Sequence, residues 1–599
     1  MVNEAREGSE AAGDGARAGL LPLKPESRLP SWAAGWLPRV VFVLVAAIAF
    51  SPAVRTPYLL DDYLHACMIE GTFPVHRGPT ELYDFVSDGD RETLRSRGVL
   101  PWWSDAGLKI RFLRPLPSLL RFGEHRFFGS SPFLFHLHSF AWWGMAVLAA
   151  RRLFRKLLSP RASAIATLVF ALAPCHTLPL AWLANREALV SLTFGTLGLS
   201  SYLSFRQTRT MQGAVTSAAF FTLAFLSGEY AVCFFGYVLA FEFLWSARER
   251  LVVRVVRAMP FLGPAAAYLA LRAVRGYGTR GSAFYADPFS APADFLRSAP
   301  RRLLTMLVDA WFSLDGESLN SKTPLWVLGL LCAFAFLVLL GPFRKAIAAL
   351  PEAEGRATRA LLLGSVLCLA PVLAVVPSSR LLGAAVLGLS APVAVLLTRA
   401  WYDAPQSTNE LGQFAALAMG FAHLVHAPIT AFSGGLSLRA GALVFQEQAT
   451  SLRAQLKAPA DAELVTMRGF GGSFFLPFAL GVGAVPPKQW RILSQTGHVL
   501  VEREGPKVLR LTVPKDSSAF PTGVGNLFRP ERATFKPGDT LSVPGLHVKV
   551  LAVSKTGPSV LLFEFEQELE RSSVVWVTES RAGFRETPPP EVGFGVPID

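Results

Sequence analysis

Long apolar stretches separated by short polar connections fill the chain up to about residue 430. A helix that crosses a bilayer needs about 20 mostly apolar residues, so this pattern predicts about eleven such helices. They are expected at residues 36–54, 133–150, 162–180, 187–205, 212–228, 230–246, 256–273, 323–341, 359–376, 380–398 and 411–431. Two longer polar segments, residues 55–132 and 274–322, interrupt the series.

These two long loops also contain apolar residues mixed with basic ones. In the first loop, WWSDAGLKIRFLRPLPSLLRFGEHRFF combines Trp, Phe and Leu with Lys and Arg, which predicts a segment lying flat in the headgroup region. In the second loop, PRRLLTMLVDAWFSL is either a short interfacial helix or a further span.

After about residue 435 the pattern changes to alternating apolar positions broken by Gly and Pro. KVLRLTV, TLSVPGLHVKVLAV and SVLLFEFE are typical of strands, and ALVFQEQATSLRAQL before them predicts a helix. The expected fold class is therefore an all-α polytopic membrane protein over residues 31–435, followed by a β-rich domain over residues 436–599. Residues 1–30, rich in Ala, Gly and Glu, are expected to be a retained, disordered cytosolic tail.

Charge gives this arrangement a direction across the membrane. The chain is 51% hydrophobic and only 17% charged, yet its net charge is +14. In a multi-pass protein such an excess marks cytoplasmic loops, so we expect contact with membrane lipid and no nucleic acid. The basic connections RRLFRK, RERLVVRVVR and FRK fall on one side of the predicted helices. That side is expected to be cytoplasmic, which places both long loops and the β-rich domain outside the plasma (inner) membrane.

The stretch YLLDDYLHACMIEG places two adjacent acids, Asp61 and Asp62, where the first span should leave the bilayer. A charge at the bilayer centre costs roughly 2.5 to 3.5 kcal/mol, so this pair belongs at the water boundary. A solvated turn that ends the helix is the simplest interpretation. Further charges are expected on the same face: Arg111 and Arg114 in IRFLRPLP, Arg186 and Glu187 in WLANREALV, Glu229 in LSGEYAV and Arg380 in VPSSRLL.

Six motifs occur in a fixed order along the chain: YLLDDYLHA, FLRPL, FGSSPFLFHLHSFAWW, LAPCHTLPLAWLANREALVS, FLSGEYAV and SSRLL. Over residues 36–435 this series resembles the GT-C membrane glycosyltransferases. It is most similar to the protein O-mannosyltransferase-like branch, including the transmembrane and tetratricopeptide repeat enzymes, here without the repeats. The resemblance implies transfer of a sugar from a polyprenyl-phosphate-linked donor to an extracytoplasmic protein, glycan or lipid, with inversion and without a cofactor.

The resemblance also implies roles for the charged residues. An acid in the first outer loop is the expected base, because an acceptor hydroxyl must lose its proton as it attacks the sugar. That base is Asp61 or Asp62; we favour Asp61, with Asp62 orienting it or the substrate. Arginine suits the leaving phosphate through its bidentate fork. Arg114 and Arg186 are the first candidates, followed by Arg111 and Arg380, with headgroup anchoring as the alternative for each.

Two features of the motifs leave alternatives open. Glu229 matches the acid of a Lys-Glu motif in the relatives, but Gly228 precedes it here, so its partner is unknown. A metal site is suggested by Asp61, His65, His136 and His138. Their spacing lacks a compact ligand pattern, however, and no metal is expected. His136 and His138 are more typical of interhelical hydrogen bonding.

Two other classes of function compete with a glycosyltransferase. A lipid or sugar-lipid transporter would also place charges near helix ends, but it should show inverted repeats and polar residues near the bilayer midplane. A non-catalytic scaffold would use its β-rich tail to bind a glycan or a protein.

Overall fold

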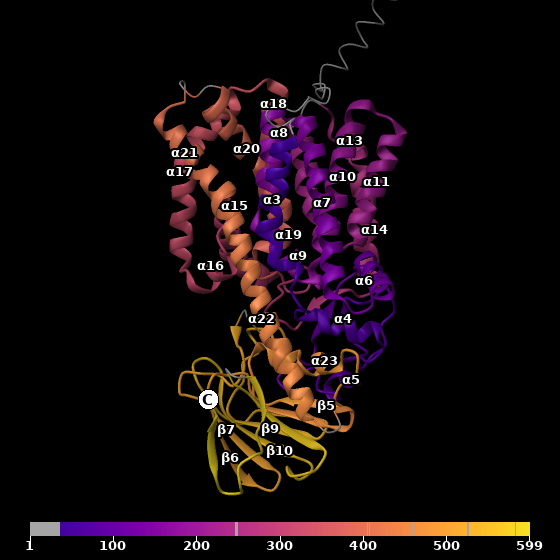
Figure 1. The fold of residues 1–599 in the computed structure, drawn as a ribbon, viewed down its shortest axis with the longest axis vertical. Helices are drawn as coiled ribbons and strands as arrows, with labels where there is room; N and C mark the ends of the chain where they lie inside the picture. Colours follow the sequence, from indigo (N-terminus) through magenta and orange to yellow (C-terminus); the bar gives the residue numbers. More distant parts are fainter. Residues whose placement is uncertain are drawn as a thin grey trace, which may run out of the picture.

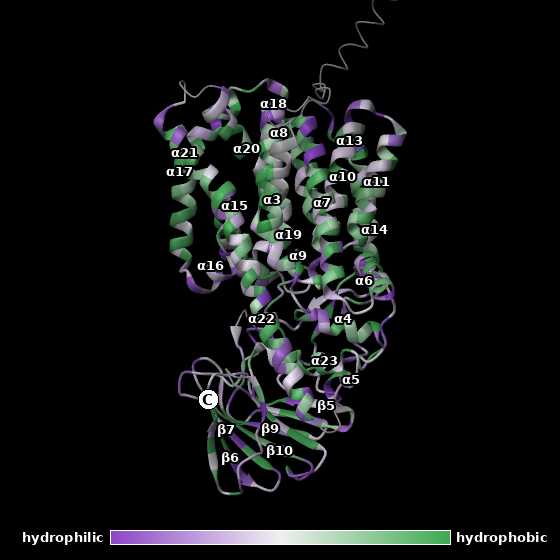
Figure 2. Cartoon of the chain, in the orientation of Figure 1, coloured by the Kyte–Doolittle hydropathy of each residue, from purple (hydrophilic) through white to green (hydrophobic). Residues whose placement is uncertain are grey.

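The computed structural model describes residues 36–245, 249–403, 405, 408–456, 459–523, 526–580 and 583–598. A bundle of long helices carries a β-rich region at one end (Figure 1). Apolar residues dominate the bundle, and polar residues gather at its two ends and on the β-rich region (Figure 2). The predicted tail, residues 1–30, lies outside the described residues.

Each of the eleven predicted spans coincides with helix. The bundle helices are α3 (Trp36–Val54), α7 (Pro132–Leu157), α8 (Pro160–Ala171), α9 (Thr177–Ala181), α10 (Glu187–Thr208), α11 (Met211–Leu226), α12 (Phe234–Trp245), α13 (Leu251–Arg257), α14 (Met259–Val274), α17 (Leu325–Ala348), α18 (Glu352–Leu367), α19 (Leu369–Val372), α20 (Gly383–Thr398), α21 (Glu410–Gly420) and α22 (Ala427–Gln455). Short 3-10 helices join several of them, among them η2 (Leu183–Asn185), η3 (Glu229–Cys233) and η4 (Ser379–Leu382).

Within the described residues, six helices are long and apolar enough to cross a membrane, or eight if each of two bent pairs counts as one span. The predicted count of about eleven is therefore not confirmed. α8 and α9 meet at a bend of 46°, and α13 and α14 at 68°. α11 and α12 have 16 and 12 residues, fewer than a full crossing needs. The chain is a multi-pass membrane protein.

The second long loop contributes two helices, α15 (Pro292–Phe312) and α16 (Gly316–Lys322). α15 has 21 residues and packs against α17, but it does not meet the criteria for a span because it carries several charges. The segment PRRLLTMLVDAWFSL is thus the second half of a long amphipathic helix at the side of the bundle.

Two sheets form the C-terminal region, which confirms its predicted β-rich character. Its strands are β4 (Glu463–Arg468), β5 (Gln489–Ile492), β6 (Val499–Gly505), β7 (Val508–Thr512), β8 (Thr540–Val543), β9 (Leu546–Val553), β10 (Pro558–Phe565), β11 (Val574–Ser580), β12 (Gly583–Glu586) and β13 (Gly595–Ile598). One sheet has six antiparallel strands in the order β13-β6-β7-β10-β9-β8. The other has the order β12-β11-β4-β5, in which β4 is parallel to both neighbours.

The first long loop packs into the β-rich region. Its elements are α4 (Asp61–Ile69), β1 (Asp84–Val86), α5 (Arg91–Ser96), β2 (Lys109–Arg111) and α6 (Pro115–Phe128). Trp102 and Trp103 are only 3% and 1% exposed. The Trp102 indole donates to the Leu493 carbonyl at 3.1 Å, and Trp103 stacks on Phe520 at 5.0 Å. The prediction that this segment lies flat on the membrane is therefore wrong for its tryptophans, which serve a protein core.

Two further elements connect the loops, the bundle and the β-rich region. β3 (Gly278–Arg280) of the second loop pairs with β2 of the first, and β2 pairs with β1. α22 continues without a break past residue 435, the predicted boundary between domains, and runs into the β-rich region. There Phe445 contacts both Tyr63 of α4 and Phe584 of β12.

Candidate functional site

A cavity of about 380 Å³ brings together residues that lie far apart in the sequence. Four of the residues predicted from the sequence line it: Asp61, Arg114, Glu229 and Arg380. They come from the start of α4, the turn before α6, η3 and η4. The lining also includes Tyr83, Trp182, Asn185, Glu187, Arg272, Tyr285, Asp287 and Phe289.

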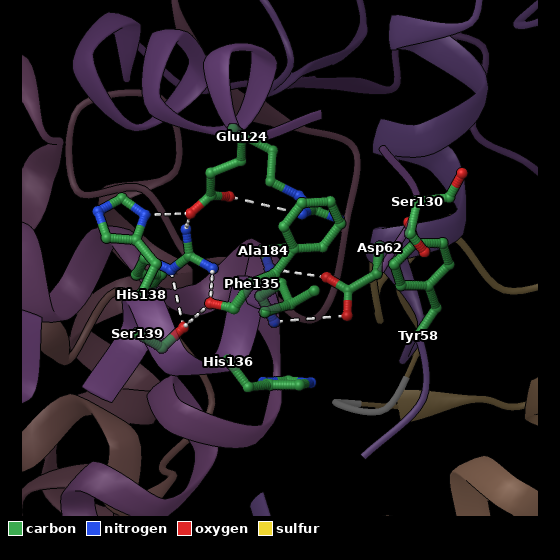
Figure 3. Close-up of polar contacts among 12 residues, drawn as sticks. Tyr58, Asp62, Glu124, Ser130, Phe135, His136, His138, Ser139 and Ala184 are labelled. Carbon is green, nitrogen blue, oxygen red and sulfur yellow. Dashed lines mark hydrogen bonds and ion pairs between the residues drawn. The ribbon is translucent and has the colours of Figure 1, made fainter. Parts of the chain in front are cut away.

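Asp61 and Asp62 point in different directions, although they are adjacent. Asp62 is buried, and its carboxylate accepts hydrogen bonds from the backbone N–H groups of Ala184 at 2.7 Å and Leu59 at 3.0 Å (Figure 3). A third bond, from Leu183 N–H, is longer at 3.4 Å. Asp62 thereby ties the turn before α4 to the loop before α10.

The same turn contains Leu60, whose φ of 49° lies in the left-handed region that non-glycine residues seldom adopt. Such strain persists only where surrounding contacts enforce it, and the bonds to Asp62 do so here. The consequence is that Asp61, at the first position of α4, lines the cavity instead of the protein interior. Among the described residues Asp61 has no hydrogen-bond or ion-pair partner.

Burial and charge tune both acids. Burial, and after it the neighbouring charge of Asp62, raises the pKa of Asp61 to about 7, with Arg380 opposing the shift. Burial also raises the pKa of Asp62 to about 6, opposed by Arg121 and by the backbone donors. A carboxyl group that titrates near neutral pH is well matched to general base catalysis.

Arg114 is held between two carboxylates of the cavity. Its Nη1 donates to Glu187 Oε1 at 3.0 Å, and its Nε donates to Glu229 Oε2 at 3.2 Å. Gly228 makes room for this arrangement, because a Cβ added there would lie 3.1 Å from Arg114 Cγ. Gly228 also has a φ of +135°, which favours glycine. Arg114 is thus the cationic partner of Glu229 that the sequence left unidentified.

Arg380 has no such carboxylate partner. Among the described residues it forms no ion pair, and its guanidinium carbon lies 5.0 Å from the ring centroid of Trp182. Stacking on an indole face holds a guanidinium in place without neutralising its charge. Arg380 therefore offers a positioned cation in the cavity that contains Asp61.

Arg186 and Arg111 do not line this cavity. Arg186 is buried, pairs with Glu124, and donates to Ser139 Oγ at 2.8 Å and to the Phe135 carbonyl at 2.8 Å (Figure 3). Arg111 pairs with Asp84 at 2.7 Å beside the small sheet. Both guanidinium groups are engaged by protein, so the structure places neither with Asp61.

Two of the three histidines that suggested a metal, His136 and His138, form hydrogen bonds within the protein. The two ring nitrogens of His136 lie 2.8 Å and 2.9 Å from the carbonyls of Leu180 and Thr56, in keeping with the interhelical role predicted for it. His138 contacts Glu124 and accepts from the Trp142 indole at 3.0 Å. Within the described ranges no group of three His, Cys, Asp or Glu side chains could hold a metal ion.

The sequence placed Glu187 on the same face as Arg186 but gave it no role, and the cavity includes Glu187 and leaves Arg186 out. Sequence reasoning missed other residues of the lining. Tyr285 and Asp287 belong to FYADPF in the second long loop, where an acid among aromatic residues was the available signal. Asp287 pairs with Arg272 at 2.8 Å, so an ion pair joins this segment to α14 in the wall of the cavity.

No protein-family model matches the sequence, and no curated protein matches it. Seventeen chains in solved structures are similar to this one. ArnT from Cupriavidus metallidurans, bound to undecaprenyl phosphate, is 14% identical over 78% of this chain and 87% of its own, with a TM-score of 0.39. The oligosaccharyltransferase of Archaeoglobus fulgidus is 13% identical over 77% and 65%, with a TM-score of 0.41. The mycobacterial arabinofuranosyltransferase AftD is 14% identical over 90% and 42%, with a TM-score of 0.38.

This chain thus spans about two thirds of the archaeal enzyme and less than half of AftD. Two of the three proteins are named as transferases of sugars. At these identities and TM-scores, the similarity concerns the broad arrangement of the helices and assigns no activity.

Proposed function

We propose that this protein is a membrane glycosyltransferase that moves a sugar from a polyprenyl-phosphate-linked donor to an extracytoplasmic acceptor, with inversion. One observation carries the proposal: the Asp61 carboxylate and the Arg380 guanidinium line the same cavity of about 380 Å³, and neither is in an ion pair with a described residue. Such a site provides a base for an acceptor hydroxyl and a cation for a leaving phosphate. The donor class and the inversion are those that the motif resemblance implies.

The reaction can be written with these groups alone. The acceptor oxygen attacks the anomeric carbon while its proton passes to Asp61. The bond between the anomeric carbon and the phosphate oxygen breaks, and the electron pair leaves with the polyprenyl phosphate. Arg380 stabilises the negative charge that develops on that phosphate. Arg114 was a first candidate for this role, but Glu187 and Glu229 already occupy its guanidinium. We assign to Arg114 the task of holding these acids in place.

The charge distribution supports a site that faces away from the cytosol. The basic segments before α8, around α13 and before α18 lie at the bundle end opposite the β-rich region (Figure 1). By the positive-inside rule that end is cytoplasmic. The cavity, the first long loop and the β-rich region then lie on the outer side of the plasma membrane.

The test uses the full chain in vesicles with a radiolabelled polyprenyl-phosphate sugar. Membranes of a deletion strain supply the acceptor in its unmodified state. We expect label to enter an acceptor with the wild-type chain and not with Asp61→Asn. Label that crosses the vesicle membrane without changing its chemical linkage would instead indicate a transporter. Donor binding without transfer or transport would indicate a scaffold.

A further inference from the structure

A second and larger groove, of about 870 Å³, lies beside the cavity that contains Asp61. Its walls are the first half of α15, the segment after β3, and residues 530–532 of the β-rich region. The two hollows share Thr279, Tyr285 and Asp287 in their linings. The Tyr285 segment bridges Val375, and the Ala286 N–H donates to the Ala374 carbonyl at 2.8 Å. This short wall therefore separates the groove from the site of chemistry.

The groove is rich in arginine. Five arginines line it, against three acids: Arg280, Arg297, Arg301, Arg302 and Arg532 against Asp287, Asp294 and Glu531. Asp287 is already paired with Arg272, outside this set. Asp294 is shared by Arg297 at 3.6 Å and Arg532 at 3.7 Å, which are both long for an ion pair. Arg280 is paired with Asp88 at 3.1 Å, also outside this set, so the excess of positive charge comes from the other four arginines, which face only Asp294 and Glu531.

Arg302 makes this excess energetically significant. Arg302 is only 3% exposed, and its Nη1 donates to the Leu373 carbonyl at 2.8 Å. Arg301 next to it donates to the carbonyls of Asn320 and Thr323. Among the described residues neither arginine has a carboxylate within ion-pair distance. Burying a guanidinium without a counterion is costly, so an anionic ligand would relieve that cost.

We propose that this arginine groove binds a phosphate group of the acceptor, and that the acceptor hydroxyl reaches Asp61 past the wall at Tyr285–Asp287. Planar guanidinium groups bind phosphate oxygens in pairs, which suits an arginine-lined site. The phosphate belongs either to a water-soluble phosphorylated glycan or to a lipid headgroup. Only the identification of the bound molecule as the acceptor rests on the proposed function, because phosphate binding can be measured without any transfer.

The experiment measures binding to the full chain in phosphatidylcholine nanodiscs. The soluble probe is fluorescent pentamannose phosphate, and the lipid probe is phosphatidylglycerol counted by native mass spectrometry. The main variant is Arg297→Glu with Arg532→Glu, since both side chains are more than 70% exposed and the fold should tolerate the change. Arg302→Gln removes the buried charge, and Arg585→Glu, an exposed arginine on β12, is the matched control.

We expect the wild-type chain to bind one of the two probes, with an affinity that falls as salt rises. The double variant and Arg302→Gln should each bind at least about tenfold more weakly, and Arg585→Glu should bind as the wild type does. Loss of soluble-probe binding identifies a phosphorylated glycan, and loss of phosphatidylglycerol binding identifies a lipid acceptor. Unchanged binding in the double variant, or no binding of either probe by the wild type, would overturn the proposal.

A matched melting temperature separates loss of binding from loss of fold. Asp61→Asn should retain full probe binding. If the wild-type chain binds the probe in the groove but transfers no sugar, the proposed function fails while the groove assignment stands.

Discussion

Replacing each acid of the Asp61–Asp62 pair by Asn should produce two different defects, because only one carboxylate is bonded to the fold. Asp62 accepts backbone N–H bonds on both oxygens, from Ala184 on Oδ1 and from Leu59 on Oδ2. An amide offers one oxygen, so its NH₂ group would face a backbone donor. A buried N–H left without an acceptor costs about 1–3 kcal/mol. Asp62→Asn should therefore lower the unfolding free energy by about 2 kcal/mol.

Asp61→Asn should have the opposite profile. No described residue bonds to the Asp61 carboxylate, so the substitution removes no hydrogen bond and also removes repulsion from Asp62. The unfolding free energy should stay the same or rise. Removal of a general base should reduce the transfer rate by about 10²- to 10⁴-fold. Donor binding should not change, because the substitution leaves Arg380, the proposed cation for the donor phosphate, in place.

The two profiles are separated by measuring thermal unfolding and single-turnover transfer on the same preparations. Asp516→Asn is the matched control, since Asp516 is an exposed acid of the β-rich region, far along the chain from the cavity residues. Full transfer by Asp61→Asn would refute the assignment of the base. Unchanged unfolding in Asp62→Asn would refute the positioning role of its hydrogen bonds.

Three further predictions follow from the cavity. Arg380→Ala should raise the KM for the donor about tenfold or more. Arg380→Lys should raise this KM less, because lysine keeps the positive charge but lacks the planar guanidinium fork. Equal KM values in the wild type and both variants would contradict a phosphate role. Gly228→Ala should lower the melting temperature by several degrees and weaken transfer, because a φ of +135° strains alanine and the added Cβ, 3.1 Å from Arg114 Cγ, would make that side chain shift. A wild-type melting curve would contradict this. kcat/KM should rise with pH around a midpoint of about 7, as Asp61 loses its proton. Between about pH 4 and 7 the folded chain holds that proton and the unfolded chain does not, so the unfolding free energy should fall as pH rises, and it should fall less in Asp61→Asn.

Helix positions and the face of the candidate site were predictable because both follow from local pattern. Apolar runs of span length mark helices, and charges at their ends must meet water. This was sufficient to place Asp61, Arg114, Glu229 and Arg380 on one face, and the cavity brings the four together. The number of crossings was not predictable, because apolar content does not show where a helix bends or stops short.

Partners distant in sequence were also beyond prediction. Glu229 and Arg114 are 115 positions apart, and no local signal joins them. Arg186 was expected at the phosphate, but Glu124 holds it, and Glu124 lies on a helix whose composition indicates only a membrane surface. Trp102 and Trp103 show the same limit, since Trp beside Arg and Lys is equally typical of an interface and of the edge of a protein core.

The shared core of the first long loop and the β-rich region has a consequence for biosynthesis. Residues 58–110 pack against residues 449–598, which leave the ribosome hundreds of codons later. At about 5–20 residues per second, that delay amounts to tens of seconds. Throughout it the first long loop lacks a large part of its apolar core. The nascent chain therefore enters the membrane with this core exposed, and the core closes only when the last strands have been delivered.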